Sequence, residues 1–243
     1  MLDNMETLKV KFSLSDNDVK EITDEIKKLQ KMLKDTDKLY NNKYRKKLEQ
    51  YHWVIPYGME YLELNKILSE SNTQNDFYNK LLNYFNDNIV NDIFDKIINL
   101  EINEHREMIN QIRKSYFENY FSLINCSIIS LIDYNLMFYL KDKRNLKRQK
   151  LADELINQTK MESGYFFSKY ELNIVLNFIK FLFNKIDFNN IILSEEQLLN
   201  RHLSQHGFLS SNKKIDSLLL INVLYYLLEF QCIFKKYENS IIW

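Results

Sequence analysis

Residues 116–140 read YFENYFSLINCSIISLIDYNLMFYL, and this stretch decides the fold. Apolar side chains would lie on nearly every side of a helix built from it, which is typical of a helix enclosed by others. A second apolar stretch, 218–234, carries polar residues only at helical intervals (Asn222, Glu229 and Gln231). A membrane span needs about 20 residues with fewer polar groups. We therefore predict a buried helix over 213–237 that packs against the helix at 116–140.

The composition favours an all-α fold and a water-exposed, intracellular setting. The 243 residues include three glycines and one proline, too few for the corners of most β architectures. Hydrophobic residues make up 45%, enough for a core, which excludes a disordered chain. Cys126 and Cys232 lie in apolar runs and are expected to be free core thiols in a reducing compartment. The first residues show no basic stretch followed by an apolar one, so we expect no secretory signal, a cytoplasmic location and no membrane partner.

The charge balance and the positions of proline and glycine suggest how the chain is divided. The 33 basic and 33 acidic residues balance, which excludes a globally basic nucleic-acid binder but leaves a local basic surface open. The segment Trp53–Met59, WVIPYGM, holds the only proline and one of the glycines. Because these residues interrupt helices, we expect a boundary there, with an N-terminal helical region at 1–58 and a helical bundle at 59–243.

The residues with the clearest chemistry lie at 194–207, SEEQLLNRHLSQHG. Ser194 and Gln197 form the pattern of a capping box that starts a helix, and Gly207 is suited to end it. The polar end of this short helix carries a group of possible ligands and acid–base residues: Asn200, Arg201, His202, Ser204 and His206.

Three interpretations of this group remain open. The histidines can be cations that favour a helix C-terminus. His202 and His206, four residues apart, can share a zinc ion, although no third ligand lies nearby in the sequence. Alternatively a histidine moves the protons, and Arg201 binds the phosphoryl oxygens, in cleavage of RNA without a metal. Arg201 and His206 lie about 140° apart around an ideal helix, so a joint site requires a bent helix or a second chain.

The string Asn-Arg-His-x-x-x-His-Gly at 200–207 resembles the R-x4–6-H signature of HEPN domains, which are helical ribonucleases of bacterial defence and toxin–antitoxin systems. Trp53–Pro56 and the segment from Asn119 to Asp133 are similar to a subset of that family. The resemblance implies a HEPN-like helical bundle and a metal-independent endoribonuclease without a cofactor, acting as a toxin or anti-phage effector. It also implies a homodimer with the two Gly207 turns near its axis, RNA as substrate and a cyclic phosphate product. Arg201 would stabilise the transition state, His206 would be the acid or base, and His202 would orient its neighbours.

A basic run at 141–150, KDKRNLKRQK, is the largest concentration of positive charge. It is either a solvated helix end or a surface that follows the RNA backbone; in the second case Asn200 and Ser204 bind substrate together with four cations, Lys143, Arg144, Lys147 and Arg148. An antitoxin or sensor protein is a further expected partner. The alternative function is a non-catalytic helical module that binds a protein or nucleotide.

Overall fold

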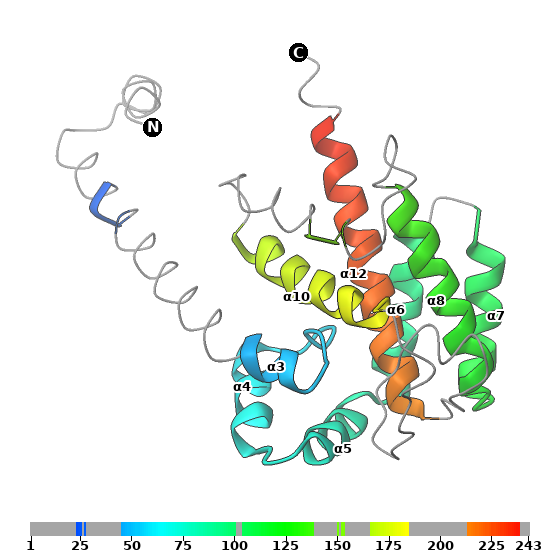
Figure 1. Ribbon diagram of the computed structural model, residues 1–243, viewed down its shortest axis with the longest axis horizontal. Helices are drawn as coiled ribbons and strands as arrows, with labels where there is room; N and C mark the ends of the chain where they lie inside the picture. The colour runs from blue at the N-terminus through cyan, green and yellow to red at the C-terminus, as the bar shows by residue number, and fades with distance from the viewer. Residues whose placement is uncertain are drawn as a thin grey trace. The chain divides into compact units, whose positions relative to one another are not determined.

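The computed structural model describes residues 23–25, 27, 45–100, 104–138, 150, 152–153, 166–184 and 213–238, and the regular elements among them are helices (Figure 1). This confirms the predicted all-α class. Contacts between Cα atoms divide the chain into two compact units, Met1–Arg45 and Lys46–Trp243. In the first unit the described residues are helical, and Lys27 lies 3.6 Å from the carboxylate of Asp24.

Short connections join the helices that come first along the chain. In chain order they are α3 (Arg45–Gln50), α4 (Tyr61–Glu70), α5 (Gln74–Tyr84), α6 (Asp87–Leu100), α7 (Arg106–Phe117), α8 (Phe121–Phe138), α10 (Phe166–Leu182) and α12 (Lys214–Glu238).

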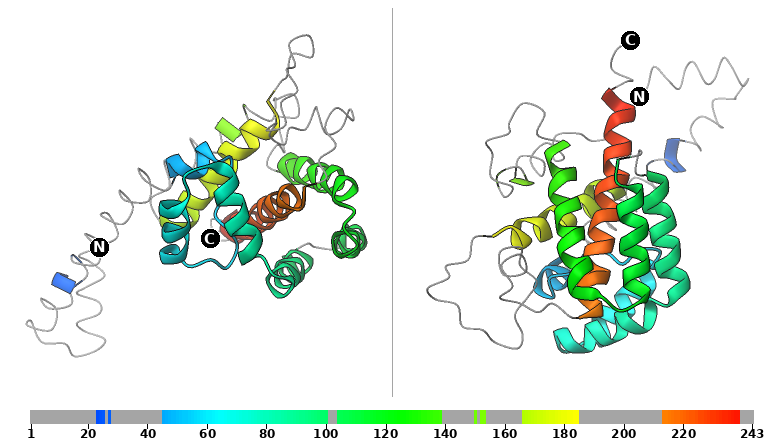
Figure 2. Two further views of the ribbon diagram at one scale, coloured as in Figure 1. Left: turned by 90° about the horizontal axis from the view of Figure 1, so that it is seen from below. Right: turned by 90° about the vertical axis from the view of Figure 1, so that its right-hand side faces the viewer.

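Helix α12 is the centre of the second unit. It packs against α5, α6, α8 and α10, and Figure 2 shows it nearly end-on with other helices around it. By length and composition the part Lys214–Cys232 is apolar enough to cross a membrane, but 83% of its most apolar window is buried inside the fold. The predicted burial of this segment is therefore confirmed, and its contacts with four helices place it at the centre of the core.

The predicted packing of the two apolar helices is also confirmed, because α8 and α12 lie against each other. Two buried polar pairs join them. Ser217 donates a hydrogen bond to the side-chain oxygen of Asn125 at 2.7 Å, and Gln231 donates to the side-chain oxygen of Asn135 at 2.9 Å. Asn125 and Ser217 lie near the first residues of their helices, and Asn135 and Gln231 lie nearer the last ones. The two helices therefore run in the same direction.

Helix α8 is shorter than the predicted 116–140 helix because a turn separates it from α7. Asn119 adopts the left-handed conformation, with φ +64°, and the N–H of Tyr120 donates to the carbonyl of Ser115 at 2.9 Å. Asparagine accepts this conformation more readily than most residues. The apolar pattern runs through the turn because Tyr116 is buried on one side of it, so the pattern alone does not reveal the break.

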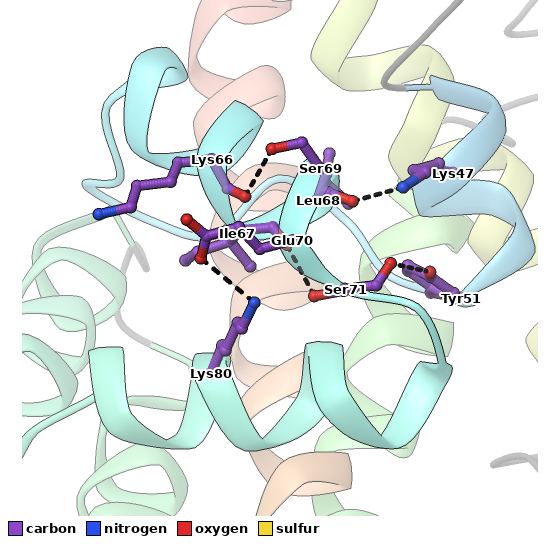
Figure 3. A network of polar contacts seen from close by, with 9 residues as sticks. All are labelled: Lys47, Tyr51, Lys66, Ile67, Leu68, Ser69, Glu70, Ser71 and Lys80. Atoms are coloured by element: carbon purple, nitrogen blue, oxygen red, sulfur yellow. Dashed lines mark hydrogen bonds and ion pairs between the residues drawn. The ribbon is translucent and has the colours of Figure 1, made fainter.

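A polar network joins α3 and the residue after it to the end of α4, and an ion pair joins Glu70 of α4 to Lys80 of α5 (Figure 3). The last carbonyl groups of a helix have no partner within the helix. Here Lys47 donates to the carbonyl of Leu68, and the hydroxyl of Tyr51 donates to the carbonyl of Ser71 at 3.1 Å. Thr73 then caps α5 by accepting from the N–H of Asp76 at 3.1 Å. The break between α4 and α5 thus coincides with a set of satisfied helix ends.

The division between the compact units falls earlier in the chain than the expected boundary at residue 58. Trp53, Val54 and Ile55 are buried in the second unit. Proline and glycine mark a turn at this point, but the apolar residues before them draw the segment into the core rather than leaving it as a linker.

Candidate functional site

The site residues expected from the sequence lie outside the described residues. These are Asn200, Arg201, His202, Ser204 and His206, together with the basic residues Lys143, Arg144, Lys147 and Arg148. The first group belongs to the segment of sequence between α10 and α12. Helix α12 begins at Lys214, and its buried residues begin at Ile215. Their chemistry stays a prediction.

In the part of the chain that the structure describes, chemistry-bearing side chains gather around a turn at 56–59. The N–H of Met59 donates to the carbonyl of Pro56, and Gly58 has φ +69°, the left-handed value that a type II turn requires at this position. The turn is held by side chains from distant helices. Its Tyr57 N–H donates to the Asn222 side chain at 2.7 Å, and its carbonyl accepts from the Tyr84 hydroxyl at 3.0 Å.

Beside this turn lies a group of six residues that we call the tyrosine–glutamate cluster, made up of Tyr57, Tyr61, Glu171, Tyr225, Tyr226 and Glu229. The Tyr61 hydroxyl of α4 donates to Glu171 of α10 at 3.2 Å. The Tyr225 hydroxyl donates to Glu229, one turn later on α12, at 2.9 Å. The rings of Tyr57 and Tyr225 meet edge to face with centroids 4.8 Å apart. Three helices and one turn therefore contribute to a single polar group.

The environment of Glu171 disfavours its negative charge. The pKa of this carboxyl is raised to about 7: burial is the largest cause, the hydrogen bond from Tyr61 opposes the change, and the nearby carboxylate of Glu229 adds to it. No lysine or arginine among the described residues forms an ion pair with either glutamate. Glu171 therefore exchanges a proton near neutral pH.

The phenols around the two glutamates remain neutral. Burial, followed by the charges of Glu171 and Glu229, raises the pKa of Tyr226 well above its ordinary value, and burial with Glu229 does the same for Tyr225. The cluster can hold a proton or donate hydrogen bonds, but its carboxylates would repel a phosphate. It therefore differs in chemistry from the RNA site that Arg201 and His206 predict.

The sequence contained a signal for this cluster. Asn222, Tyr225 and Glu229 follow each other at helical intervals, so they lie along one stripe of α12. Glu171 is harder to find, because a single glutamate in an otherwise apolar helix is usually solvated. Its burial results from α4 and α12, which lie far away in the sequence.

The described residues offer no candidate metal site, and the chain matches no known protein. Across the described residues, no three or more His, Cys, Asp or Glu side chains are placed to hold a metal ion. Cys126 and Cys232, expected as core thiols, are half-buried and are not joined by a disulfide. Comparison of the chain with protein families, curated proteins and solved structures finds no match.

Proposed function

We propose that this chain is a metal-independent endoribonuclease that acts in the bacterial cytoplasm as a toxin or anti-phage effector. Arg201 holds the phosphoryl oxygens as negative charge develops, and His206 transfers the proton. His202 orients the phosphate or the His206 side chain. The site is completed by the same residues of a second copy, since the two groups would lie on different sides of an ideal straight helix.

The observation that supports this proposal is the string at 200–207 in its local context. It follows a capping box at 194–197, ends at a glycine and precedes a long apolar helix. Helix α12 begins at Lys214, and its first turn contains the buried residues Ile215 and Ser217. A well-packed helix therefore begins seven residues after Gly207, and catalytic residues are often carried on segments that connect such helices.

The test is expression of the wild type and of His206→Ala in a bacterial host, followed by growth and RNA integrity, and then cleavage by the purified proteins. We expect the wild type to cleave RNA in excess chelator and to leave a 2′,3′-cyclic phosphate. Loss of the acid or base should reduce the rate by about 10²–10⁴-fold. Wild-type cleavage by His206→Ala would exclude the catalytic role and favour the binding module.

Two further variants separate the roles within the motif. Arg201→Lys retains the charge but loses the planar group that meets two oxygens at once, so we expect it to be nearly as inactive as Arg201→Ala. His202→Ala should have a milder effect if this residue only positions its neighbours. Circular dichroism on each variant controls for loss of the fold.

A further inference from the structure

The two glutamates of the tyrosine–glutamate cluster hold negative charge that no cation balances in the part of the chain that the structure describes. Glu171 belongs to α10 and Glu229 to α12, and the carboxylate of Glu229 contributes, after burial, to the raised pKa of Glu171. The two carboxyl groups therefore lie within electrostatic reach of each other. Neither is paired with a lysine or arginine among the described residues. A positive charge placed beside both would remove their repulsion.

The same cluster contains a buried hydroxyl group without a partner. Tyr226 is 6% exposed, and no hydrogen bond joins its hydroxyl to another residue that the structure describes. Burial is the largest cause of the raised pKa of this phenol, and the charges of Glu171 and Glu229 add to it, so the hydroxyl lies within reach of both carboxylates. Because buried polar groups nearly always have a hydrogen-bond partner, an unpaired hydroxyl at this place indicates that a ligand supplies one.

The hydrogen bonds inside the cluster leave room for further donors. Glu171 accepts from the Tyr61 hydroxyl at 3.2 Å, and Glu229 accepts from the Tyr225 hydroxyl at 2.9 Å. An ionised carboxylate has about four lone-pair positions, so each glutamate can accept at least one more hydrogen bond. Together with the phenol oxygen of Tyr226, the cluster offers three acceptors to a single donor group.

The cluster combines access from solvent with aromatic surface. Glu171, Glu229, Tyr57 and Tyr225 are half-buried, whereas Tyr226 is buried. The ring of Tyr225 contacts that of Tyr57 at 4.8 Å and that of Tyr226 at 5.2 Å between centroids, both edge to face. Aromatic rings attract cations and also bury the alkyl part of a charged group. A small molecule can therefore reach the carboxylates and bury its apolar part without unfolding the protein.

We propose that the tyrosine–glutamate cluster binds the primary ammonium group of an alkylamine, either a free amine or the side chain of a lysine. An ammonium group has three N–H donors, one for the carboxylate of Glu171, one for that of Glu229 and one for the oxygen of Tyr226. The alkyl chain packs on the neighbouring tyrosine rings. The proposal rests on this cluster and does not depend on the ribonuclease chemistry of Arg201 and His206.

Other cations match these acceptors less well. A quaternary ammonium ion has no N–H group, so it would leave the Tyr226 hydroxyl without a partner. Calcium and magnesium ions take about six or more oxygen ligands, whereas the cluster supplies two carboxylates. The number and type of acceptors therefore favour a primary amine.

The first test is isothermal titration calorimetry of the purified chain with four ligands. Butylamine represents a free amine, and Nα-acetyl-lysine methylamide represents a lysine side chain. Both are charged at neutral pH, since an alkylamine has a pKa of about 10. We expect a dissociation constant of about 1 mM or lower for at least one of them, and the ligand that binds more strongly identifies the source. Tetramethylammonium and butanol should bind at least about tenfold more weakly.

The second test uses the proton on Glu171, whose pKa is about 7. The amine binds the ionised carboxyl, which also faces Tyr61 from α4 and Tyr225, Tyr226 and Glu229 from α12. We therefore expect the affinity to rise about tenfold from pH 6 to pH 8, with release of about half a proton per bound amine at pH 7. Titrations in two buffers of different ionisation enthalpy measure this proton. Glu171→Gln should bind more weakly, and its affinity should not depend on pH over this range.

Two further variants test the other acceptors. Glu229→Gln and Tyr226→Phe should each weaken amine binding at least about tenfold. Tyr226→Phe removes a hydroxyl that has no partner among the described residues, so the fold should be retained, and thermal melts would verify this. The matched controls are Glu107→Gln on α7 and Tyr120→Phe, whose side chains are exposed and lie outside the cluster. Both should bind the amine like wild type.

Four outcomes would overturn the proposal. These are no binding of either amine at 10-fold the expected dissociation constant, equal binding of tetramethylammonium, an affinity that does not change between pH 6 and pH 8, and wild-type binding by Tyr226→Phe. None of these measurements involves RNA, so their result is separate from that of His206→Ala.

Discussion

Replacing Glu171 with glutamine should make the protein more stable at neutral and alkaline pH. The folded chain holds the Glu171 proton more tightly than the unfolded chain, because burial raises the pKa of this carboxyl from 4.5 to about 7. The stabilising effect of the protonated form is fully present below pH 4.5 and is lost as the pH rises through 7. The difference between the two pKa values, about 2.5, corresponds to at most about 3 kcal/mol.

Glutamine imitates the neutral carboxyl and still accepts the hydrogen bond from Tyr61. We therefore expect the advantage of Glu171→Gln over wild type to grow by about 2 kcal/mol between pH 5 and pH 8. In urea this is a shift of the midpoint by about 1 M. Glu107→Gln, at an exposed glutamate in the first turn of α7, is the matched control for the loss of one carboxylate from the surface. Parallel stability curves for wild type and Glu171→Gln would refute the argument from burial and from Glu229.

Three other outcomes follow from named contacts. Gly58→Ala should cost about 1–2 kcal/mol of unfolding free energy in urea, because φ +69° strains any residue with a Cβ atom; an unchanged midpoint would contradict this. Ser217→Ala should cost about 1–3 kcal/mol by the same measurement, since the buried Asn125 oxygen loses its donor, and Ser127→Ala on the surface of α8 is the control. Exchange of Lys143, Arg144, Lys147 and Arg148 for glutamine should flatten the salt dependence of RNA binding, and an equal slope would exclude these residues as phosphate contacts.

The central helices could be predicted because their apolar pattern requires burial. Apolar residues on nearly every side of 116–140 and 213–237 require that most of each helix be covered by other helices. The exact start of α8 could not be predicted, because the Asn119 turn lies inside the same apolar pattern and depends on a backbone angle rather than on hydrophobicity.

The turn at 56–59 shows a different limit. Pro56 and Gly58 mark the turn correctly, but they do not reveal whether it faces solvent or the core. It is anchored to the core by a hydrogen bond to Asn222, which lies 165 residues from Tyr57. The same applies to Glu171, whose raised pKa is due to neighbours on α4 and α12. Periodicity identifies the helices, whereas the chemistry of a side chain depends on contacts that periodicity does not contain.

The two polar pairs between α8 and α12 restrict how these helices can move. Sliding one helix past the other by a turn, about 5.4 Å, would break both the Ser217–Asn125 and the Gln231–Asn135 hydrogen bonds inside the core. Each buried group left without a partner costs about 1–3 kcal/mol, whereas purely apolar helices would slip with a much smaller penalty. The axial register of α12 is thus locked to α8. A rearrangement at the segment that enters α12 must tilt or rotate the pair as one body, or leave it unmoved.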